Sequence, residues 1–209
     1  TDTMRYHAEH KISYFFGPTT INSEENIIYC ENGWYNSLSN KSQFRENTTI
    51  THKDFVLKGD SIFYNRNKGY GKAINNIELI DSINNLLITG DLGEYFEKKE
   101  NAMVCQNALL NLITEGDTLF VHADTFLSTK KLEQREIRAF YDVKCFKQDM
   151  QAICDSLAYN LKDSTIELFN KPVIWSEKFQ ITADSIRLLL TDGKIKKMFL
   201  RHNPMLISK

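Results

Sequence analysis

Seven acidic residues recur along the chain at intervals of 29 to 33 residues, at Asp2, Glu31, Asp60, Asp91, Asp124, Asp155 and Asp184. A stacked row of carboxylates is an arrangement that binds cations or moves protons, provided that the charges tolerate one another. Stacked carboxylates repel unless each is exposed or hydrogen-bonded. The glycine-rich nonapeptides of a calcium-binding β-roll are absent from the sequence. We therefore expect structural acids that accept hydrogen bonds from backbone N–H groups at their own bends, and no metal site.

The other reactive residue types show no catalytic or metal-binding pattern. The five histidines share no interval, and they are His7, His10, His52, His122 and His202. The four cysteines include no CxxC pair and are interpreted as small buried residues, at Cys30, Cys105, Cys145 and Cys154. No GxSxG, HExxH or P-loop motif occurs. We therefore predict that the protein is not an enzyme and that it needs no cofactor.

The composition narrows the class of protein further. The chain has 209 residues and a formal net charge of −1, which argues against a nucleic-acid partner because such proteins usually carry a basic surplus. No apolar run approaches the roughly 20 residues of a membrane-spanning helix. The sequence opens without a signal peptide, so a secreted origin is left open at this point.

The acids belong to a repeated pattern of a small residue, an acid and a small or polar residue, followed by apolar and aromatic positions. The third copy reads Gly59-Asp60-Ser61-Ile62-Phe63-Tyr64. A second element, a turn-forming residue followed by an apolar alternation, comes about 15–20 residues after most of the acids, as in Asn75-Asn76-Ile77-Glu78-Leu79. A fixed period is the signature of a repeat fold. We expect residues 1–209 to form one domain of seven two-strand repeats of about 30 residues, and to be part of a longer repeat chain because both ends cut a repeat.

The apolar positions predict strands that change their inward side at each acid. Before the acid, small or apolar residues occupy positions −3 and −1, as at Leu57 and Gly59. After it, they occupy +2 and +4, as at Ile62 and Tyr64. Side chains of a strand alternate strictly, so this change requires a bulge or a bend. Stacked bends would fold an all-β sheet into a trough or flattened barrel about 34 Å long, with one layer per repeat.

The interior of this trough is predicted to be lined by apolar and aromatic side chains. If the trough does not close on itself, it leaves an apolar groove of the kind that a lipid acyl chain needs. The candidate lipid-binding residues are Leu57, Ile62, Tyr64, Ile88, Tyr95, Val121, Phe126, Leu157, Tyr159, Ile181, Ile186 and Leu188.

The ordered motifs resemble the OstA-like, LptA-type β-jellyroll family of the Gram-negative cell envelope. They read Gly17-Pro18-Thr19 with Ile21, Gly59-Asp60-Ser61 with Tyr64, and Cys154-Asp155-Ser156-Leu157 with Tyr159. The run from Ile28 to Tyr35 is also similar to a segment of the larger OstA-like proteins. The sequence departs from the pattern at Glu31 with Trp34-Tyr35 and at Gly93, so we expect an irregular groove there.

The resemblance implies a fold, a ligand, a location and partners. The implied fold is a "taco"-shaped β-jellyroll, and the implied location is the periplasm. The implied function is to carry lipopolysaccharide, or a related lipid, toward the outer membrane, with its acyl chains in the trough. The implied partners are other OstA-like domains or transport components that stack end to end by pairing of edge strands.

Two other functions remain open at this point. The first is a structural, self-assembling β-solenoid that binds no lipid, whose sign would be a tightly filled interior. The second is a right-handed β-helix enzyme acting on polysaccharide, which would need a surface cluster of carboxylates or basic residues in register. We find no such cluster in the sequence.

Overall fold

The computed structural model describes residues 1–24, 26–53, 55–114, 117–131, 134–191 and 194–208, and most of them lie in one antiparallel sheet of 17 strands. The predicted all-β repeat fold is thereby confirmed. Among the described residues no helix is long and apolar enough to cross a membrane. The elements are β1 (Thr3–His7), β2 (Ile12–Asn22), β3 (Asn26–Asn36), β4 (Lys41–His52), β5 (Phe55–Asn65), β6 (Tyr70–Asp81), β7 (Leu86–Phe96), the short 3-10 helix η1 (Glu97–Lys99), β8 (Asn101–Thr114), β9 (Asp117–Lys131), β10 (Gln134–Lys147), β11 (Met150–Asn160), β12 (Thr165–Phe169), β13 (Val173–Ser176), β14 (Phe179–Thr182), β15 (Ser185–Thr191), β16 (Lys194–Arg201) and β17 (Met205–Ser208).

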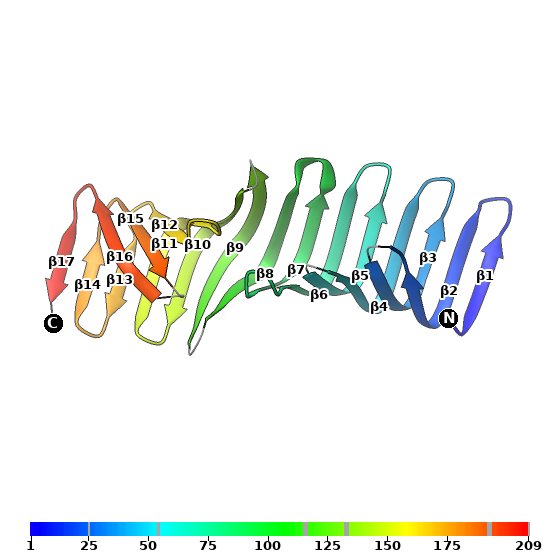
Figure 1. Cartoon of the computed structure of the whole chain (residues 1–209), viewed down its shortest axis with the longest axis horizontal. Helices are drawn as coiled ribbons and strands as arrows, with labels where there is room; N and C mark the ends of the chain where they lie inside the picture. Colours follow the sequence, from blue (N-terminus) through cyan, green and yellow to red (C-terminus); the bar gives the residue numbers. More distant parts are fainter. Residues whose placement is uncertain (25, 54, 115–116, 132–133, 192–193, 209) are drawn as a thin grey trace.

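The strands lie side by side along the long axis of the molecule, with the two termini at opposite ends (Figure 1). Consecutive strands from β1 to β11 pair as antiparallel hairpins. Three later strands are each interrupted at the bend, as β12 and β13, β14 and β15, and β16 and β17. Each repeat therefore adds two strands to the stack, and the expectation of one layer per repeat is wrong. At the usual strand spacing the seven repeats make a stack of about 67 Å rather than 34 Å.

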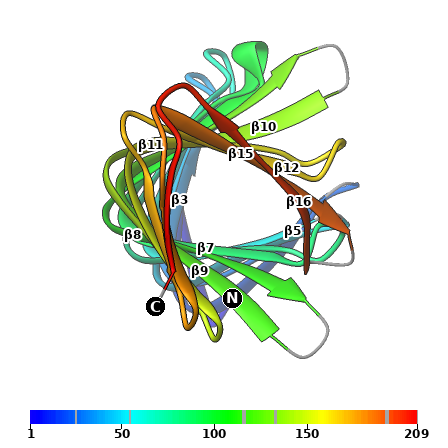
Figure 2. The same cartoon turned by 90° about the vertical axis from the view of Figure 1, so that its left-hand side faces the viewer.

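Each long strand bends near its middle, which divides the sheet into two arms that curve toward each other when viewed down the stack (Figure 2). In the third repeat the first arm contains residues 61–65 paired with 70–74, and the second arm contains residues 55–58 paired with 78–81. Toward the C-terminus the arms become separate ladders. The first arm continues as β12, β15 and β16, and the second as β13, β14 and β17.

The bend is built on left-handed residues in every second strand of the stack, counting each interrupted strand as one. In β6 these are Asn75 and Asn76, with φ angles of 57° and 50°. The pair inserts one extra residue, because residues 74–77 of β6 face residues 90–92 of β7. The bulge therefore lies in the strand opposite the acid, and asparagine suits it because its short polar side chain tolerates positive φ. The same pair occurs at 46–47, 106–107, 141–142, 170–171 and 202–203, and Gly17 takes its place in β2.

Candidate functional site

The carboxylates and the left-handed asparagines meet at the corner between the arms. Asn76 Nδ2 donates a hydrogen bond to Asp60 Oδ2 at 2.9 Å, and Asn107 Nδ2 donates to Asp91 Oδ2 at 2.6 Å. Three further bonds of this kind, from 2.7 to 3.0 Å, join Asn47 to Glu31, Asn170 to Asp155 and Asn203 to Asp184. These acids thus accept hydrogen bonds from side-chain amides of the following strand. The donors differ from the prediction, which named backbone N–H groups of the acid's own bend.

The remaining two acids, Asp2 and Asp124, do not face an asparagine of a left-handed pair. Asp2 lies against Gly17, where an added Cβ would stand 2.5 Å from Asp2 Oδ2. At Asp124 the facing residue of the left-handed pair is Asp142 in place of asparagine, and the Asp124 carboxylate accepts instead from the Thr125 hydroxyl at 2.8 Å. Lys144 Nζ binds Asp142 Oδ2 at 2.7 Å, which lowers the pKa of the Asp142 carboxyl. Asp142 thus pairs with Lys144 of its own strand, and Asp124 with its neighbour Thr125.

Replacing Asp142 by asparagine is expected to raise the thermal midpoint of unfolding. The change supplies the amide donor found at five other corners and removes a carboxylate that faces Asp124. The matched control is the reverse change in the neighbouring repeat, Asn107→Asp, which should destabilise the protein by about 1 kcal/mol. Thermal and urea unfolding of both variants measures the two effects. Shifts of the same sign would contradict the pairing rule.

Buried positions change parity at each of these corners, so the interior is lined from both sides of the acid. Of the twelve candidate lipid-binding residues, three are half-buried, at Leu57, Tyr64 and Tyr159, and Tyr95 is exposed. The other eight are buried, at Ile62, Ile88, Val121, Phe126, Leu157, Ile181, Ile186 and Leu188. The structure thus places eleven of the twelve wholly or partly inside.

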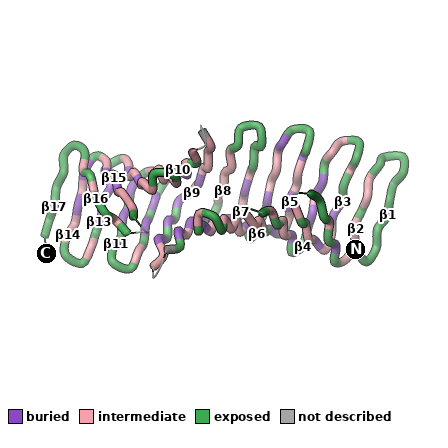
Figure 3. The backbone as a smooth tube through the Cα atoms, in the orientation of Figure 1, coloured by how far each residue is buried: buried purple, intermediate pink, exposed green. Residues whose placement is uncertain are grey.

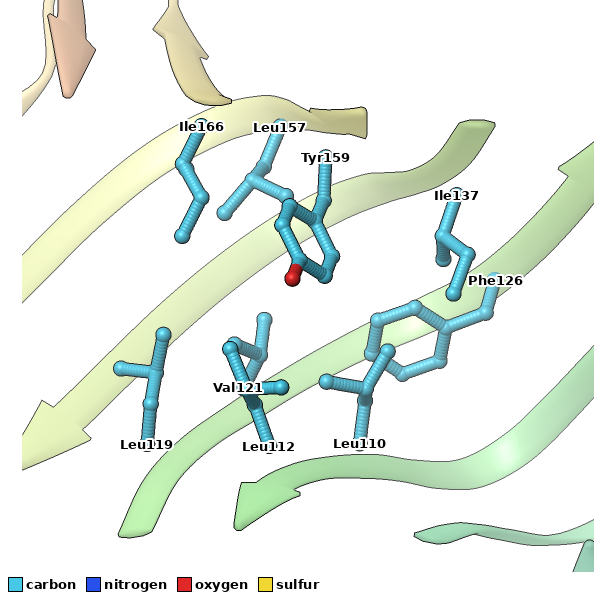
Figure 4. A pocket seen from close by; sticks show the side chains of 9 residues that line it. All are labelled: Leu110, Leu112, Leu119, Val121, Phe126, Ile137, Leu157, Tyr159 and Ile166. Atoms are coloured by element: carbon cyan, nitrogen blue, oxygen red, sulfur yellow. The ribbon is translucent and has the colours of Figure 1, made fainter. Parts of the chain in front are cut away.

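The interior of the second half, strands β8–β15, is a packed core. Side chains from the two arms point toward one another there, with Leu110 and Val121 of the second arm facing Phe126 and Ile137 of the first (Figure 4). The space left between them is an apolar cavity of about 10 Å³. A second cavity of about 20 Å³ lies beside it, toward Leu188 and Ile195. Each has the volume of about one water molecule, far too little for an acyl chain.

The interior of the first half, strands β2–β6, is less covered. The exposure of the two halves can be compared at the −3 position, three residues before each acid. Ile28 and Leu57 are half-buried there, whereas Val121 and Ile181 are 3% and 5% exposed in the second half. The buried cluster of the first half contains three residues, with two more packed against it, and they are Ile62, Ala73, Ile77, Ile50 and Leu57. The arms of the first half therefore leave part of their apolar lining accessible.

Sequence reasoning missed several residues that line the first half. Phe15, Ile21 and Ile50 face inward and are half-buried, yet none belongs to the predicted set. They lie on even-numbered strands, whose inward residues we did not place. For Ile50 the signal was weak because Thr48, Thr49 and Thr51 surround it. Counting from the corner of each strand, at Gly17 in β2 and at 46–47 in β4, locates these positions.

Charged side chains and tyrosine hydroxyls lie at the outer ends of the arms. The Tyr64 hydroxyl donates to Glu97 Oε2 at 2.8 Å, and the Tyr70 hydroxyl donates to Glu94 Oε1 at 2.6 Å. Burial and these acceptor carboxylates raise the pKa of both phenols to about 12. At the end of the second arm Lys147 pairs with Asp117 at 3.4 Å. Closer to the corner the interior is lined by apolar side chains together with the buried Thr19 and Thr48.

All four cysteines are free thiols, and three of them are buried on the inner face. Burial raises the pKa of Cys145, and it raises the pKa of Cys154 to about 12. These thiols are therefore protonated and unreactive at neutral pH. They pack as small interior residues next to the corner.

Comparison with known proteins gives one family match and a set of distant structural likenesses. The model of the OstA-like protein family matches residues 1–60. No curated protein matches the chain. Among solved structures the chain is similar to LptH from Pseudomonas aeruginosa, described as the LptA-homologous periplasmic component of the conserved lipopolysaccharide transport device. The two are 10% identical with a TM-score of 0.30, over 72% of this chain and 92% of LptH.

The matched segment contains β1–β4 and the first three acids, Asp2, Glu31 and Asp60. These elements form the first corners of the stack and part of the less covered interior. Residues 1–60 of the chain are therefore OstA-like, and the family resemblance is confirmed for this segment.

Proposed function

We propose that this chain is a non-enzymatic periplasmic scaffold that holds the acyl chains of lipopolysaccharide, or of a related lipid, between the arms of its first half. One observation carries the proposal. The inward side chains Ile28 and Leu57 stay partly exposed in the first half, while Val121 and Ile181 at the same −3 position are buried in the second half. Exposed apolar surface lined up inside a fold marks a site for an apolar ligand.

The chemistry of the lining selects the ligand class. Most inward side chains of the first half are aliphatic or aromatic, as at Phe15, Ile28, Ile50 and Leu57, with the buried Thr19 and Thr48 next to the corner. No buried charge is present among them, so the lining favours hydrocarbon over a polar or ionic ligand. Covering such surface contributes about 25 cal/mol for each Å² removed from water. A chain of methylene groups laid along several strands therefore suits the site.

The family resemblance supplies the identity of the lipid and the compartment. The OstA-like match covers residues 1–60, which include most of the less covered interior. The resemblance implies a transport scaffold of the cell envelope that carries lipopolysaccharide toward the outer membrane, and not an enzyme. The proposed lipid contacts are Leu57 and Tyr64, which are only half-buried, next to the buried Ile62. The candidates of the second half pack against one another, so they contact lipid only if the arms part.

Site-specific photo-crosslinking tests the proposal. With p-benzoylphenylalanine at Leu57 or Tyr64, irradiation of the full chain with lipopolysaccharide is expected to give an adduct. The matched control is Lys58, the neighbour of Leu57, which is exposed on the outer face. A site at Leu157, in the packed half, should give no adduct. Absence of adducts from both inner sites of a folded protein, or an equal yield from Lys58, would refute lipid binding between the arms.

The ends of the stack fit pairing with further OstA-like domains or transport components. All residues of β1 and β17 are exposed (Figure 3), and each strand pairs with one neighbour among the described residues. Unpaired backbone groups on an edge strand add a strand from another chain. Strand β17 also presents Met205, Leu206 and Ile207 at 49–62% exposure. The same crosslinker at Leu206 should therefore give protein–protein adducts.

The packed second half favours a second candidate function, a self-assembling β-scaffold that carries no lipid. Its interior has space for about one water molecule in each of two cavities. The crosslinking experiment separates the two functions. Protein adducts from Leu206 without lipid adducts from Leu57 or Tyr64 would favour the scaffold.

A further inference from the structure

We propose that the first hairpin turn binds a Zn²⁺ ion through His7, Glu9 and His10. His7 is the last residue of β1, and the other two lie in the four-residue turn that leads into β2. One ligand atom from each side chain, a ring nitrogen or a carboxylate oxygen, lies within 4.8 Å of the other two. All three side chains are exposed, so an ion reaches them without opening the sheet.

The two imidazoles are already held next to each other. Their ring centroids are 4.6 Å apart and the rings are nearly parallel, with an interplanar angle of 13°. His7 Nδ1 accepts a long hydrogen bond of 3.4 Å from the His10 backbone N–H. Its lone pair therefore points into the turn, and a metal ion would replace only this weak bond. Two histidines and one glutamate form a known ligand set for Zn²⁺, with a fourth position left for water or another ligand.

The backbone of the turn is anchored at both ends. His7 pairs with Ile12 to close the hairpin, and Lys11 adopts a left-handed φ of 53°. The Lys11 carbonyl accepts the Ser37 backbone N–H of the next hairpin at 3.0 Å. The ligands thus project from a fixed loop, and small rotations of exposed side chains bring them onto one ion. Partial preorganisation of this kind raises metal affinity.

The cluster is not a by-product of the repeat. The equivalent turns of the first arm, at 37–40, 66–69, 97–100 and 161–164, contain no histidine. The His-x-Glu-His combination belongs to the outermost hairpin, whose strand β1 is exposed along its whole length. An ion bound there would tie the two ends of the turn together and hold the register of this edge strand. The predicted absence of metal ligands followed from the intervals between histidines, and that reasoning overlooked a cluster within one turn.

Titration of the full-length, tag-free chain with Zn²⁺ alone tests the site. We expect one ion per chain by isothermal titration calorimetry, with affinity reduced at least about tenfold in His7→Ala and in His10→Ala. Glu9→Gln should weaken binding as well, because it replaces an anionic oxygen ligand by a neutral amide. His122→Ala, a change at another exposed histidine, is the matched control and should bind like the parent chain.

Hydrogen exchange gives a second readout that does not depend on heat of binding. Zn²⁺ should slow amide exchange in β1 and the start of β2 of the parent chain, and leave exchange unchanged in His7→Ala. All three ligands are exposed, so the variants are expected to keep the fold, which circular dichroism checks. Failure to bind Zn²⁺, or binding that His7→Ala and His10→Ala leave intact, would overturn the proposal. Neither outcome bears on lipid binding, because the turn lies outside the interior.

Discussion

Replacing Phe126 by alanine is expected to lower the free energy of unfolding by about 3–5 kcal/mol. The side chain is 2% exposed and lies where the two arms of the second half meet. It stands beside Val104 on β8 and Ala139 on β10, which are too small to fill the space that it would leave. Urea unfolding monitored by circular dichroism measures the loss.

Phe120 provides the matched control for this prediction. It lies on the same strand, β9, but on the outer face at 38% exposure, in contact with the Phe146 ring at a centroid distance of 6.4 Å. Phe120→Ala should therefore cost less than about 1 kcal/mol. Equal losses for the two variants would show that the second half is not a packed core.

Replacing Gly33 by alanine is expected to destabilise the protein by about 1–3 kcal/mol. A Cβ at this position would stand 2.8 Å from the Gln43 carbonyl oxygen and 3.2 Å from the Phe44 ring. Gly33 pairs with Phe44 across β3 and β4, and the Phe44 side chain, 5% exposed, fills the space in front of the glycine. A backbone atom cannot move aside as a flexible side chain would, so the strand pair must shift.

Gly71 is the control, because it is also a strand glycine of the first arm. A Cβ there would meet its nearest atom, in the Tyr64 ring, at 3.6 Å, which is ordinary contact. Gly71→Ala should be neutral or stabilising by up to about 1 kcal/mol, since alanine restricts the unfolded chain more than glycine does. Thermal unfolding of the two variants compares them directly. A larger loss for Gly71→Ala would contradict the assigned close contact at Gly33.

The strands and the corner could be predicted from the sequence because both depend on local alternation. Leu57, Gly59 and Ile62 show the change of parity directly, and the structure buries the side chains on both sides of Asp60 accordingly. The position of the extra residue was less visible. It lies opposite the acid, at Asn75-Asn76, where two turn-forming residues look like the start of a new strand rather than the middle of a long one.

The open or packed state of the interior could not be predicted, since it depends on the distance between arms that are far apart in sequence. Leu57 and Ile181 occupy the same −3 position, yet the first is half-buried and the second is 5% exposed. Residue type does not distinguish them. Leu57 and Ile181 differ in the strand that faces them across the interior, and the local sequence around each residue does not indicate that strand. For the same reason the sequence placed all twelve candidates in one groove.

The left-handed pair at Asn75 and Asn76 also disfavours a wrong strand register during folding. If one arm of a hairpin slipped by a single residue, the pair would move onto a neighbour such as Ile74 or Ile77. A β-branched side chain in that conformation costs about 1–2 kcal/mol. The slip would also part Asn76 from Asp60. In this repeat the pair therefore fixes the register of the hairpin independently of its neighbours.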